Sequence, residues 1–180
     1  MHEEMMIAGF GGQGVLLIGQ LIAQAALVEN KNVLWMPAYG PETRGGFANC
    51  TVMVSDSDIY SPVTSEPTSM IVMNLPSLNK FERSVKEGGF LFVNKSLVNR
   101  EVFRNDIDSI CVPVTEIARD LGNVKAANMV ALGGFIAKKP IVEFKTLIEC
   151  LPKVFKGTKE KLIPFNKEAL LKGAEYVKGM

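Results

Sequence analysis

Histidine and cysteine are scarce in this sequence, and their scarcity excludes several kinds of site. The one histidine, His2, lies at the start of the chain, so we expect no histidine-based catalytic centre. The three cysteines, Cys50, Cys111 and Cys150, are far apart and form no C-x-x-C pair, which excludes a locally encoded iron–sulfur or zinc-ribbon site. An odd, scattered set is typical of reduced thiols in the cytoplasm. We therefore expect this chain to bind no metal.

Charge and hydropathy argue against two classes of partner. A formal net charge of +1 over 180 residues predicts no general attraction to nucleic acid or to a membrane. No segment approaches the roughly 20 apolar residues of a membrane span, and the start, Met1-His2-Glu3-Glu4, lacks the basic flank of a signal peptide. We expect one cytoplasmic globular domain over residues 1–180. The mean hydropathy of +0.16 is high for such a domain and indicates a thoroughly buried sheet, a large subunit interface, or both.

A glycine-rich turn is the most informative feature that the sequence does contain. The run Gly9-Phe10-Gly11-Gly12-Gln13-Gly14 follows a short apolar run, residues 5–8, and precedes a helical pattern over residues 15–29. Glycines allow a tight turn and bring backbone N–H groups close to a ligand, and the helix start adds about half a positive charge. This pattern is typical of phosphate binding in α/β proteins. The candidate ligand-binding residues here are Gly9, Gly11, Gly12, Gln13 and Gly14.

The turn has alternative interpretations. A dinucleotide-binding motif also has an acidic residue about twenty residues further on that holds the ribose, and the second expected strand, residues 32–37, ends without a carboxylate. The glycines can also serve packing alone. Gln13 can donate from its side-chain amide to a phosphate or carbonyl group, or it can cap a neighbouring loop. We expect binding and organisation here, and we assign no catalytic residue.

A second glycine-rich segment, YGPETRGG at residues 39–46, adds further candidate binding residues. Arg44 can hold a phosphate or carboxylate through two hydrogen bonds, and Glu42 can instead neutralise it in an internal ion pair. We expect the two glycine-rich loops to share one end of the sheet. The candidate binding residues of this segment are Tyr39, Glu42, Arg44, Gly45 and Gly46.

Apolar runs bounded by turn residues predict the strands, and apolar residues at helical spacing predict the helices. Expected strands cover residues 5–8, 32–37, 48–56, 70–75, 90–93 and 109–114. Expected helices cover residues 15–29, 77–84, 115–122, 126–138, 143–151 and 167–178, with Ser77 as the cap of the second. Their alternation predicts an α/β fold, in the form of a single-domain, Rossmann-like, doubly wound and mostly parallel sheet flanked by helices.

One polar residue is unusual in its context. Asn128 lies on an otherwise apolar helix, and a buried amide needs a hydrogen-bond partner. The backbone of a loop beneath the glycine turn can supply that partner, and a solvent-facing amide explains the residue equally well.

Three motifs in this order give a resemblance to a known family. GFGGQGV at residues 9–15, YGPETRGG at residues 39–46 and VSDSDIYSP at residues 54–62 resemble the γ subunit of the 2-oxoacid:ferredoxin oxidoreductases. KAANMVALG at residues 125–133 looks like a fourth shared segment, and the C-terminal part is covered more loosely. A separate chain of this length is most similar to the γ subunit of the 2-oxoglutarate enzymes. The resemblance implies a Rossmann-like domain that packs on an α subunit near coenzyme A.

The resemblance also implies a division of labour. In that family the complex decarboxylates a 2-oxoacid on thiamine diphosphate, passes two electrons through 4Fe–4S clusters to ferredoxin and transfers the acyl group to coenzyme A. This chain has no G-D-G followed by an Asn pair for thiamine diphosphate and Mg²⁺, and no cysteine quartet, so partner α, β and δ subunits are expected to hold these groups. Coenzyme A is a candidate ligand of this chain. The isolated chain can form a homo-oligomer through the face meant for the α subunit.

Alternatives to this assignment stay open. The equivalent subunit can serve an enzyme for pyruvate, branched-chain 2-oxoacids or an arylpyruvate. From other classes, the chain can be an independent nucleotide-binding oxidoreductase that uses NAD(P) or a flavin, or an assembly protein with no ligand.

Overall fold

A computed structural model of the protein describes residues 1–39 and 46–180, and its described part forms one six-stranded sheet in the order β2-β3-β1-β4-β5-β6. Strands β1, β4, β5 and β6 are parallel, and β3 is antiparallel to both β1 and β2. The expected mostly parallel α/β sheet is confirmed. Strand β3 is reversed because the seven residues between β2 and β3 are too few for a crossover connection, which needs about a dozen. The strands are β1 (His2–Phe10), β2 (Asn32–Tyr39), β3 (Phe47–Ser55), β4 (Ser69–Val72), β5 (Phe90–Asn94) and β6 (Asp108–Val112).

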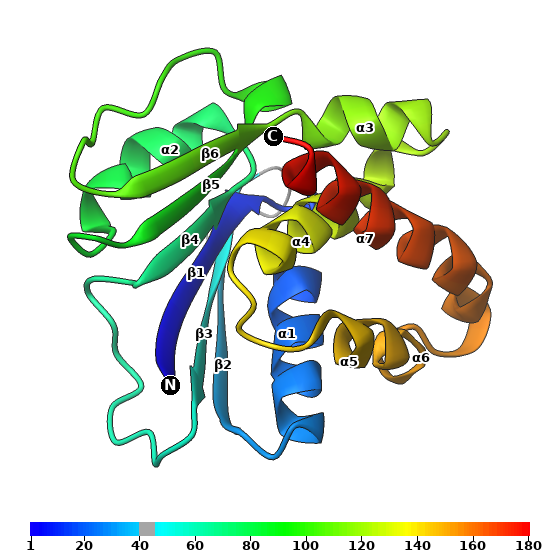
Figure 1. The fold of residues 1–180 in the computed structure, drawn as a ribbon, viewed down its shortest axis with the longest axis horizontal. Coiled ribbons are helices and arrows are strands. Elements are labelled where there is room, and N and C mark those ends of the chain that lie inside the picture. The colour runs from blue at the N-terminus through cyan, green and yellow to red at the C-terminus, as the bar shows by residue number, and fades with distance from the viewer. Residues whose placement is uncertain (40–45) are drawn as a thin grey trace.

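Helices cover the two faces of the sheet unequally. Helix α1 and helices α4 to α7 lie on one side, and α2 lies on the other (Figure 1). The helices are α1 (Val15–Val28), α2 (Leu75–Phe81), α3 (Val114–Asp120), α4 (Ala127–Lys138), α5 (Phe144–Glu149), α6 (Leu151–Val154) and α7 (Ile163–Lys178). Short 3₁₀ segments are η1 (Glu82–Ser84), η2 (Lys95–Leu97), η3 (Val124–Ala126) and η4 (Gly157–Leu162). No helix in the described residues is long and apolar enough to cross a membrane.

The main core lies between the sheet and helices α1 and α4. Helix α1 packs along β1, β2 and β3 because its apolar side chains recur at helical spacing. Fully buried members of this core include Met5, Ile18, Ile22, Phe92 and Phe135. Their burial contributes roughly 1.5–3 kcal/mol for each large side chain.

Helices α4 and α7 cross in backbone contact. A β-carbon added at Gly133 would lie 1.9 Å from the carbonyl oxygen of Leu170, and one added at Gly173 would lie 2.0 Å from that of Val130. Only glycine allows this approach.

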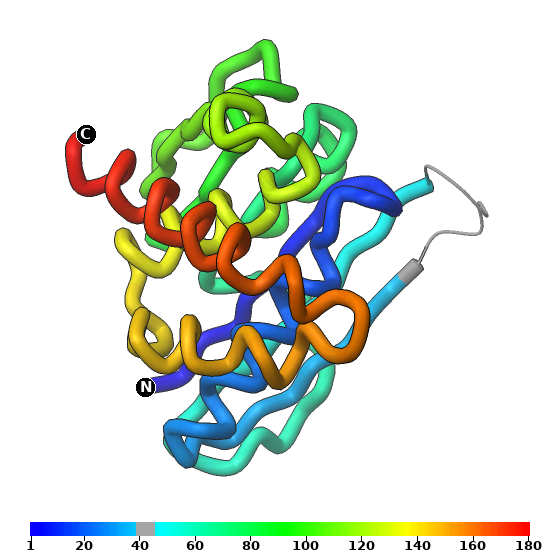
Figure 2. Tube along the Cα trace, turned by 90° about the vertical axis from the view of Figure 1, so that its right-hand side faces the viewer, coloured from blue at the N-terminus to red at the C-terminus, as the bar shows by residue number. Residues whose placement is uncertain are grey.

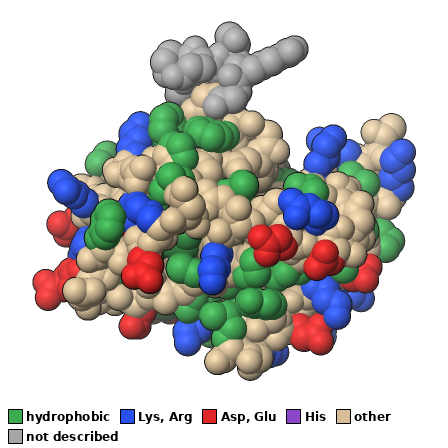
Figure 3. All heavy atoms as spheres, turned by 90° about the horizontal axis from the view of Figure 1, so that it is seen from above, with side chains coloured by type: hydrophobic (Ala, Val, Ile, Leu, Met, Phe, Trp, Pro, Cys, Tyr) green, Lys and Arg blue, Asp and Glu red, His purple; other side chains and the backbone are tan. Residues whose placement is uncertain are grey.

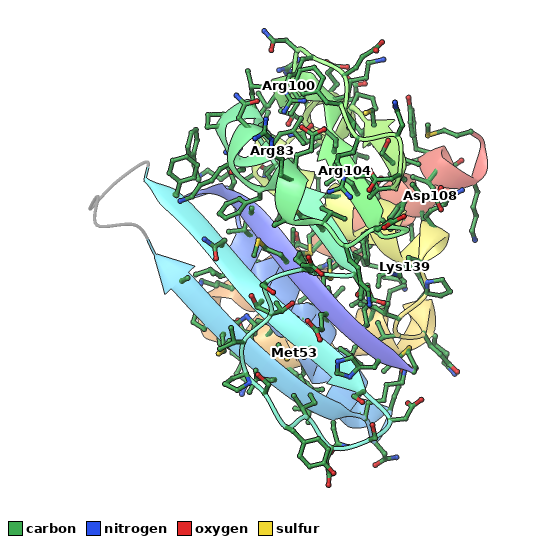
Figure 4. All side chains as sticks on the ribbon, turned by 90° about the vertical axis from the view of Figure 1, so that its left-hand side faces the viewer. Met53, Arg83, Arg100, Arg104, Asp108 and Lys139 are labelled. Atoms are coloured by element: carbon green, nitrogen blue, oxygen red, sulfur yellow. The ribbon has the colours of Figure 1, made fainter. Side chains whose placement is uncertain are left out.

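The opposite face of the sheet has a smaller cover. Helix α2 and the loop over residues 98–107 cover β4 and β5 there, around Met70 and Leu91. An ion pair of 2.6 Å between Arg100 and the buried Glu82 joins this loop to the end of α2 (Figure 4). Strands β2 and β3 carry no described helix on this side, where Met53 lies (Figure 4).

Several element boundaries differ from the expected ones. The cap of α2 is Asn74, not Ser77: its side-chain oxygen accepts from the amide of Ser77, and Pro76 suits the first turn. The helix expected over residues 143–151 is two short helices, since Pro152 cannot donate to the preceding turn. Helix α7 begins at Ile163, four residues before the expected start, and β1 is longer at both ends than residues 5–8.

Candidate functional site

The glycine turn lies where the chain reverses its winding. It joins β1 to α1 at the carboxyl end of β1, next to the end of the neighbouring parallel strand β4. From β1 the chain passes to one face of the sheet through α1, and from β4 it passes to the other face through α2 (Figure 1). Such a reversal opens a crevice between the two strand ends, which is where doubly wound α/β proteins bind ligands.

Two glycines give the turn its shape. The amide of Gln13 donates to the carbonyl of Phe10 at 3.0 Å, which closes the turn. Gly12 and Gly14 have φ angles of 97° and 71°, in the left-handed region that favours glycine. Gly14 is also the N-cap of α1, and no side chain caps this end. The described residues give no acceptor for the amides of residues 14–17, as is usual for the first turn of a helix.

The side chain of Gln13 folds back onto the protein. Its Oε1 accepts from the backbone amide of Phe10 and from Nδ2 of Asn74, both at 2.7 Å. Its Nε2 donates to the carbonyl of Met73 at 3.4 Å. Of the two roles that the sequence allows for Gln13, this geometry is that of an internal cap, which joins the turn to the end of β4.

The sequence interpretation missed two buried asparagines. Asn94 donates from Nδ2 to the carbonyl of Met73 at 3.1 Å and to Oγ1 of Thr115 at 2.9 Å, which links β4, β5 and the start of α3. Asn74 is equally internal. A signal was available in the sequence: each asparagine directly follows a run of apolar residues, at the carboxyl end of a buried strand, where ligands bind.

Asn128 lies under the turn. Its side chain is buried, which excludes the solvent-facing alternative, and Nδ2 donates to the carbonyl of Gly14 at 3.4 Å. A β-carbon on Gly14 would lie 2.3 Å from this Nδ2. Both the φ angle at Gly14 and the close approach of Asn128 therefore require glycine at this position.

The two glycine-rich segments meet, as far as the structure describes them. The amide of Gly11 donates to the carbonyl of Gly46 at 2.9 Å. Strand β2 ends at Tyr39 and β3 begins at Phe47, and both of these strand ends lie at the same end of the sheet as the glycine turn (Figure 2). Glu42, Arg44 and Gly45 lie outside the described residues, as does the side chain of Tyr39, so their expected roles stay predictions.

A small cavity of about 160 Å³ lies beside the turn. Gly12, Gln13, Met73, Thr115 and Lys125 are among its lining residues, with further apolar side chains from η2 and η3. Lys125 supplies a positive charge at this wall. Figure 3, which looks down on this end of the molecule, shows hydrophobic side chains interspersed with Lys, Arg, Asp and Glu. The cavity holds less than a drug-sized ligand, for which sites measure about 300–1,000 Å³.

The described residues show no metal centre. No group of three or more His, Cys, Asp or Glu side chains comes together within them. Burial raises the pKa of the Cys50 thiol to about 12, and burial also raises the pKa of Cys111 and Cys150. All three thiols are unpaired, and at neutral pH they are protonated, which disfavours metal binding.

The family model "Pyruvate ferredoxin/flavodoxin oxidoreductase" matches residues 4–176. The ketoisovalerate oxidoreductase subunit VorA of Methanothermobacter thermautotrophicus is 38% identical over 173 residues, which are 96% of this chain and 36% of that subunit. The chain thus spans about a third of the length of that relative. The 2-oxoglutarate synthase subunit KorC of Methanocaldococcus jannaschii is 34% identical over 172 residues, which cover 93% of this chain and 92% of KorC.

A solved structure agrees in fold and in length. The γ subunit of a keto/oxoacid ferredoxin oxidoreductase from Geobacter sulfurreducens superposes with a TM-score of 0.85 at 26% identity, over 99% of both chains. The position of the glycine turn, the family model and these relatives all indicate the same family. The chain belongs to the pyruvate ferredoxin/flavodoxin oxidoreductase family, as a chain of its γ-subunit type.

Proposed function

We propose that this chain is the γ subunit of a cytoplasmic, multi-subunit 2-oxoglutarate:ferredoxin oxidoreductase and that its glycine turn holds part of coenzyme A. The reaction converts 2-oxoglutarate and coenzyme A to succinyl-CoA and CO₂, and the two electrons released pass to ferredoxin. The observation that carries the proposal is the glycine turn at the crevice between β1 and β4, in a chain that matches KorC over nearly the whole length of both.

The residues at the turn suit the phosphate-bearing part of coenzyme A. The amides of residues 14–17, for which the described residues give no acceptor, lie at the start of α1, where the helix dipole favours an anion. Lys125 adds a positive charge at the cavity wall, and the apolar wall suits a slim, uncharged segment. Coenzyme A would supply the thiol that accepts the acyl group. This chain would bind and orient its carrier.

The size of the cavity supports a shared site. A volume of about 160 Å³ can enclose only a fraction of coenzyme A, so the remainder of the site must come from another subunit. The described residues also bring together no group of metal ligands. We therefore propose that partner α, β and δ subunits hold thiamine diphosphate, Mg²⁺ and the 4Fe–4S clusters, and that ferredoxin meets the complex through them.

A second substrate class is favoured by one observation. VorA, a ketoisovalerate oxidoreductase subunit, is slightly more identical to this chain than KorC is. VorA, however, is a longer chain of which this one spans about a third, whereas KorC is a chain of the same size. Because the match covers 92% of KorC but only 36% of VorA, we rank 2-oxoglutarate first and a branched-chain 2-oxoacid second.

Purification of the tagged chain from its native host without oxygen tests the proposal. We expect partner chains to co-purify and to reduce a viologen dye when 2-oxoglutarate and coenzyme A are both present. Faster reduction with a branched-chain 2-oxoacid would favour the second substrate. Recovery of the chain alone, with micromolar affinity for NAD(H) or FAD, would overturn the proposal.

A further inference from the structure

We propose that Gln13 and Asn74 are positioning residues, whose mutual hydrogen bond holds the glycine turn in its binding geometry, and that Asn74 does so without contacting the ligand. The inference rests on the proposed function, in that the ligand is taken to be coenzyme A at this turn. It assigns a role to Asn74, a residue 61 positions away from Gln13 that no motif in the sequence marks.

Backbone donors fix the orientation of both side-chain amides. The amide of Phe10 can only donate, so the Gln13 atom that faces it at 2.7 Å must be the carbonyl oxygen Oε1. The amide of Ser77 can likewise only donate, so Oδ1 of Asn74 faces it at 2.9 Å and Nδ2 is turned toward Gln13. In the contact between the two side chains, Nδ2 of Asn74 therefore donates to Oε1 of Gln13, which already accepts from the amide of Phe10.

This arrangement uses the hydrogen-bonding capacity of the Gln13 oxygen completely. Oε1 receives two donors at 2.7 Å each, and no lone pair is left for a ligand. The space that the side chain occupies is made by Gly9, where an added β-carbon would lie 2.7 Å from Oε1. Gly9, placed among the binding candidates by the sequence, thus makes room for the internal cap.

Asn74 can act on a ligand only through other groups. Its side chain is 4% exposed, and it is absent from the wall of the cavity beside the turn. Its Oδ1 caps α2, and its Nδ2 donates to Gln13. A change at Asn74 that alters ligand binding must therefore act by moving the turn or by altering α2.

The two effects of Asn74 are separable. Asn74→Ser keeps a capping oxygen for α2, because serine is as good an N-cap as asparagine, but its side chain is too short to reach Gln13. Gln13→Met removes the acceptor at similar length. Asn166→Ser is a matched control, because Asn166 is another buried amide, whose one hydrogen bond, to the carbonyl of Leu162, lies on α7.

Hydrogen exchange on the full chain tests the positioning directly. We expect Gln13→Met and Asn74→Ser each to speed exchange of the hydrogen-bonded amides of residues 10, 11 and 13 by about tenfold. Asn166→Ser should leave this segment unchanged. Native exchange rates at residues 10, 11 and 13 in Asn74→Ser would overturn the proposal, and this variant keeps the α2 cap, so the result does not depend on Gln13→Met folding.

Steady-state kinetics of the purified complex tests the consequence for binding. We expect Gln13→Met and Asn74→Ser to raise KM for coenzyme A by about tenfold with kcat little changed, and the double variant to resemble either single one. Asn166→Ser should raise neither. Gly11→Leu, which places bulk directly in the turn, separates the two proposals: if it raises KM and Asn74→Ser does not, the positioning proposal fails. If none of the turn variants changes KM although exchange is faster, coenzyme A binds elsewhere and the proposed function fails instead.

Discussion

The side-chain amide of Asn128 lies directly on the backbone of Gly14, to whose carbonyl oxygen it donates at 3.4 Å. This contact joins α4, late in the chain, to the start of α1 and to the turn that precedes it. No side chain caps α1, so the backbone at Gly14 and its neighbours must be held from outside the helix. Asn128 supplies one such support, and the internal cap by Gln13 supplies another.

Gly14→Ala should be strongly destabilising for two separable reasons. The φ of 71° costs a residue with a β-carbon about 1–2 kcal/mol, and the added carbon would lie 2.3 Å from Nδ2 of Asn128. We expect a loss of about 2–4 kcal/mol in the free energy of unfolding, measured by denaturant titration.

Gly157→Ala is the matched control for Gly14→Ala. Gly157 has a φ of 61°, and an added β-carbon would meet nothing within 4 Å. It should show the backbone cost alone, about 1–2 kcal/mol. Equal losses for the two variants would show that Asn128 moves aside without cost.

The architecture was predictable from the sequence because its signals are local. Apolar runs, a glycine turn before an apolar helix and short connections suffice to predict a doubly wound α/β sheet. The reversal of β3 was also open to prediction, because the segment after Tyr39 is too short for a crossover. The cap of α2 was placed wrongly since Asn74 and Ser77 are both good caps, and only Pro76, which suits a first turn, separates them.

The candidate site was less predictable because its contacts are distant in sequence. The glycines of the turn are easy to recognise in the sequence. The orientation of the Gln13 side chain, however, depends on Asn74, and the hydrogen-bond partner of Asn128 is Gly14. No periodicity in the sequence encodes such pairs. The polar residues at the ends of buried strands, Asn74 and Asn94, are the one pattern that a reader of the sequence can still use.

Substitutions at the crossing of α4 and α7 should be among the most damaging in the protein. An added methyl group at Gly133 or Gly173 would meet backbone carbonyl oxygens at 1.9 and 2.0 Å, so one helix must move away from the other. We expect Gly133→Ala or Gly173→Ala to cost at least about 3 kcal/mol of unfolding free energy, seen as a large fall in the thermal midpoint.

Gly179→Ala provides the comparison for the helix crossing. This glycine follows the same helix α7, but an added β-carbon would lie 3.6 Å from its nearest neighbour, an ordinary contact distance. Its effect should stay within about 0.5 kcal/mol. A small effect at Gly133 as well would mean that the helices can separate without loss of packing.

The thiol of Cys50 should report on opening of the core. Burial raises its pKa to about 12, and its side chain is fully covered beside α1. At pH 8 we expect iodoacetamide to modify half-buried Cys111 slowly and Cys50 only after unfolding, as measured by mass spectrometry of peptides. In denaturant all three cysteines should react. Rapid labelling of Cys50 in the native protein would contradict the buried placement.

The same thiol gives stability an alkaline limit. Below its unfolded pKa of 9.0 the thiol is neutral in both states, and its contribution is constant. Between pH 9 and about 12 the unfolded chain releases the proton and the folded chain keeps it, so stability falls by up to about 1.4 kcal/mol per pH unit. Unfolding of Cys50→Ala from pH 8 to 10.5 should show a shallower decline, and an unchanged slope would exclude this cause.

Glu29 should give stability an acid limit. Burial raises the pKa of Glu29. Hydrogen bonds from Lys31, at 2.7 Å, and from the amide of Glu143, also at 2.7 Å, together lower this pKa by more than burial raises it, so it lies below 4.5. The stabilising contribution is thus present above about pH 4.5 and is lost as pH falls through the lowered pKa. Glu29→Gln keeps an acceptor for Glu143 but leaves Lys31 without its counter-charge, and it should cost about 1–3 kcal/mol at pH 7 and flatten the acid limb. Glu175→Gln is the control, because it removes an exposed carboxylate that is paired with Lys172. The dependence of its stability on pH should match that of the native protein, and equal effects of the two variants would show that the burial of Glu29 is not the cause.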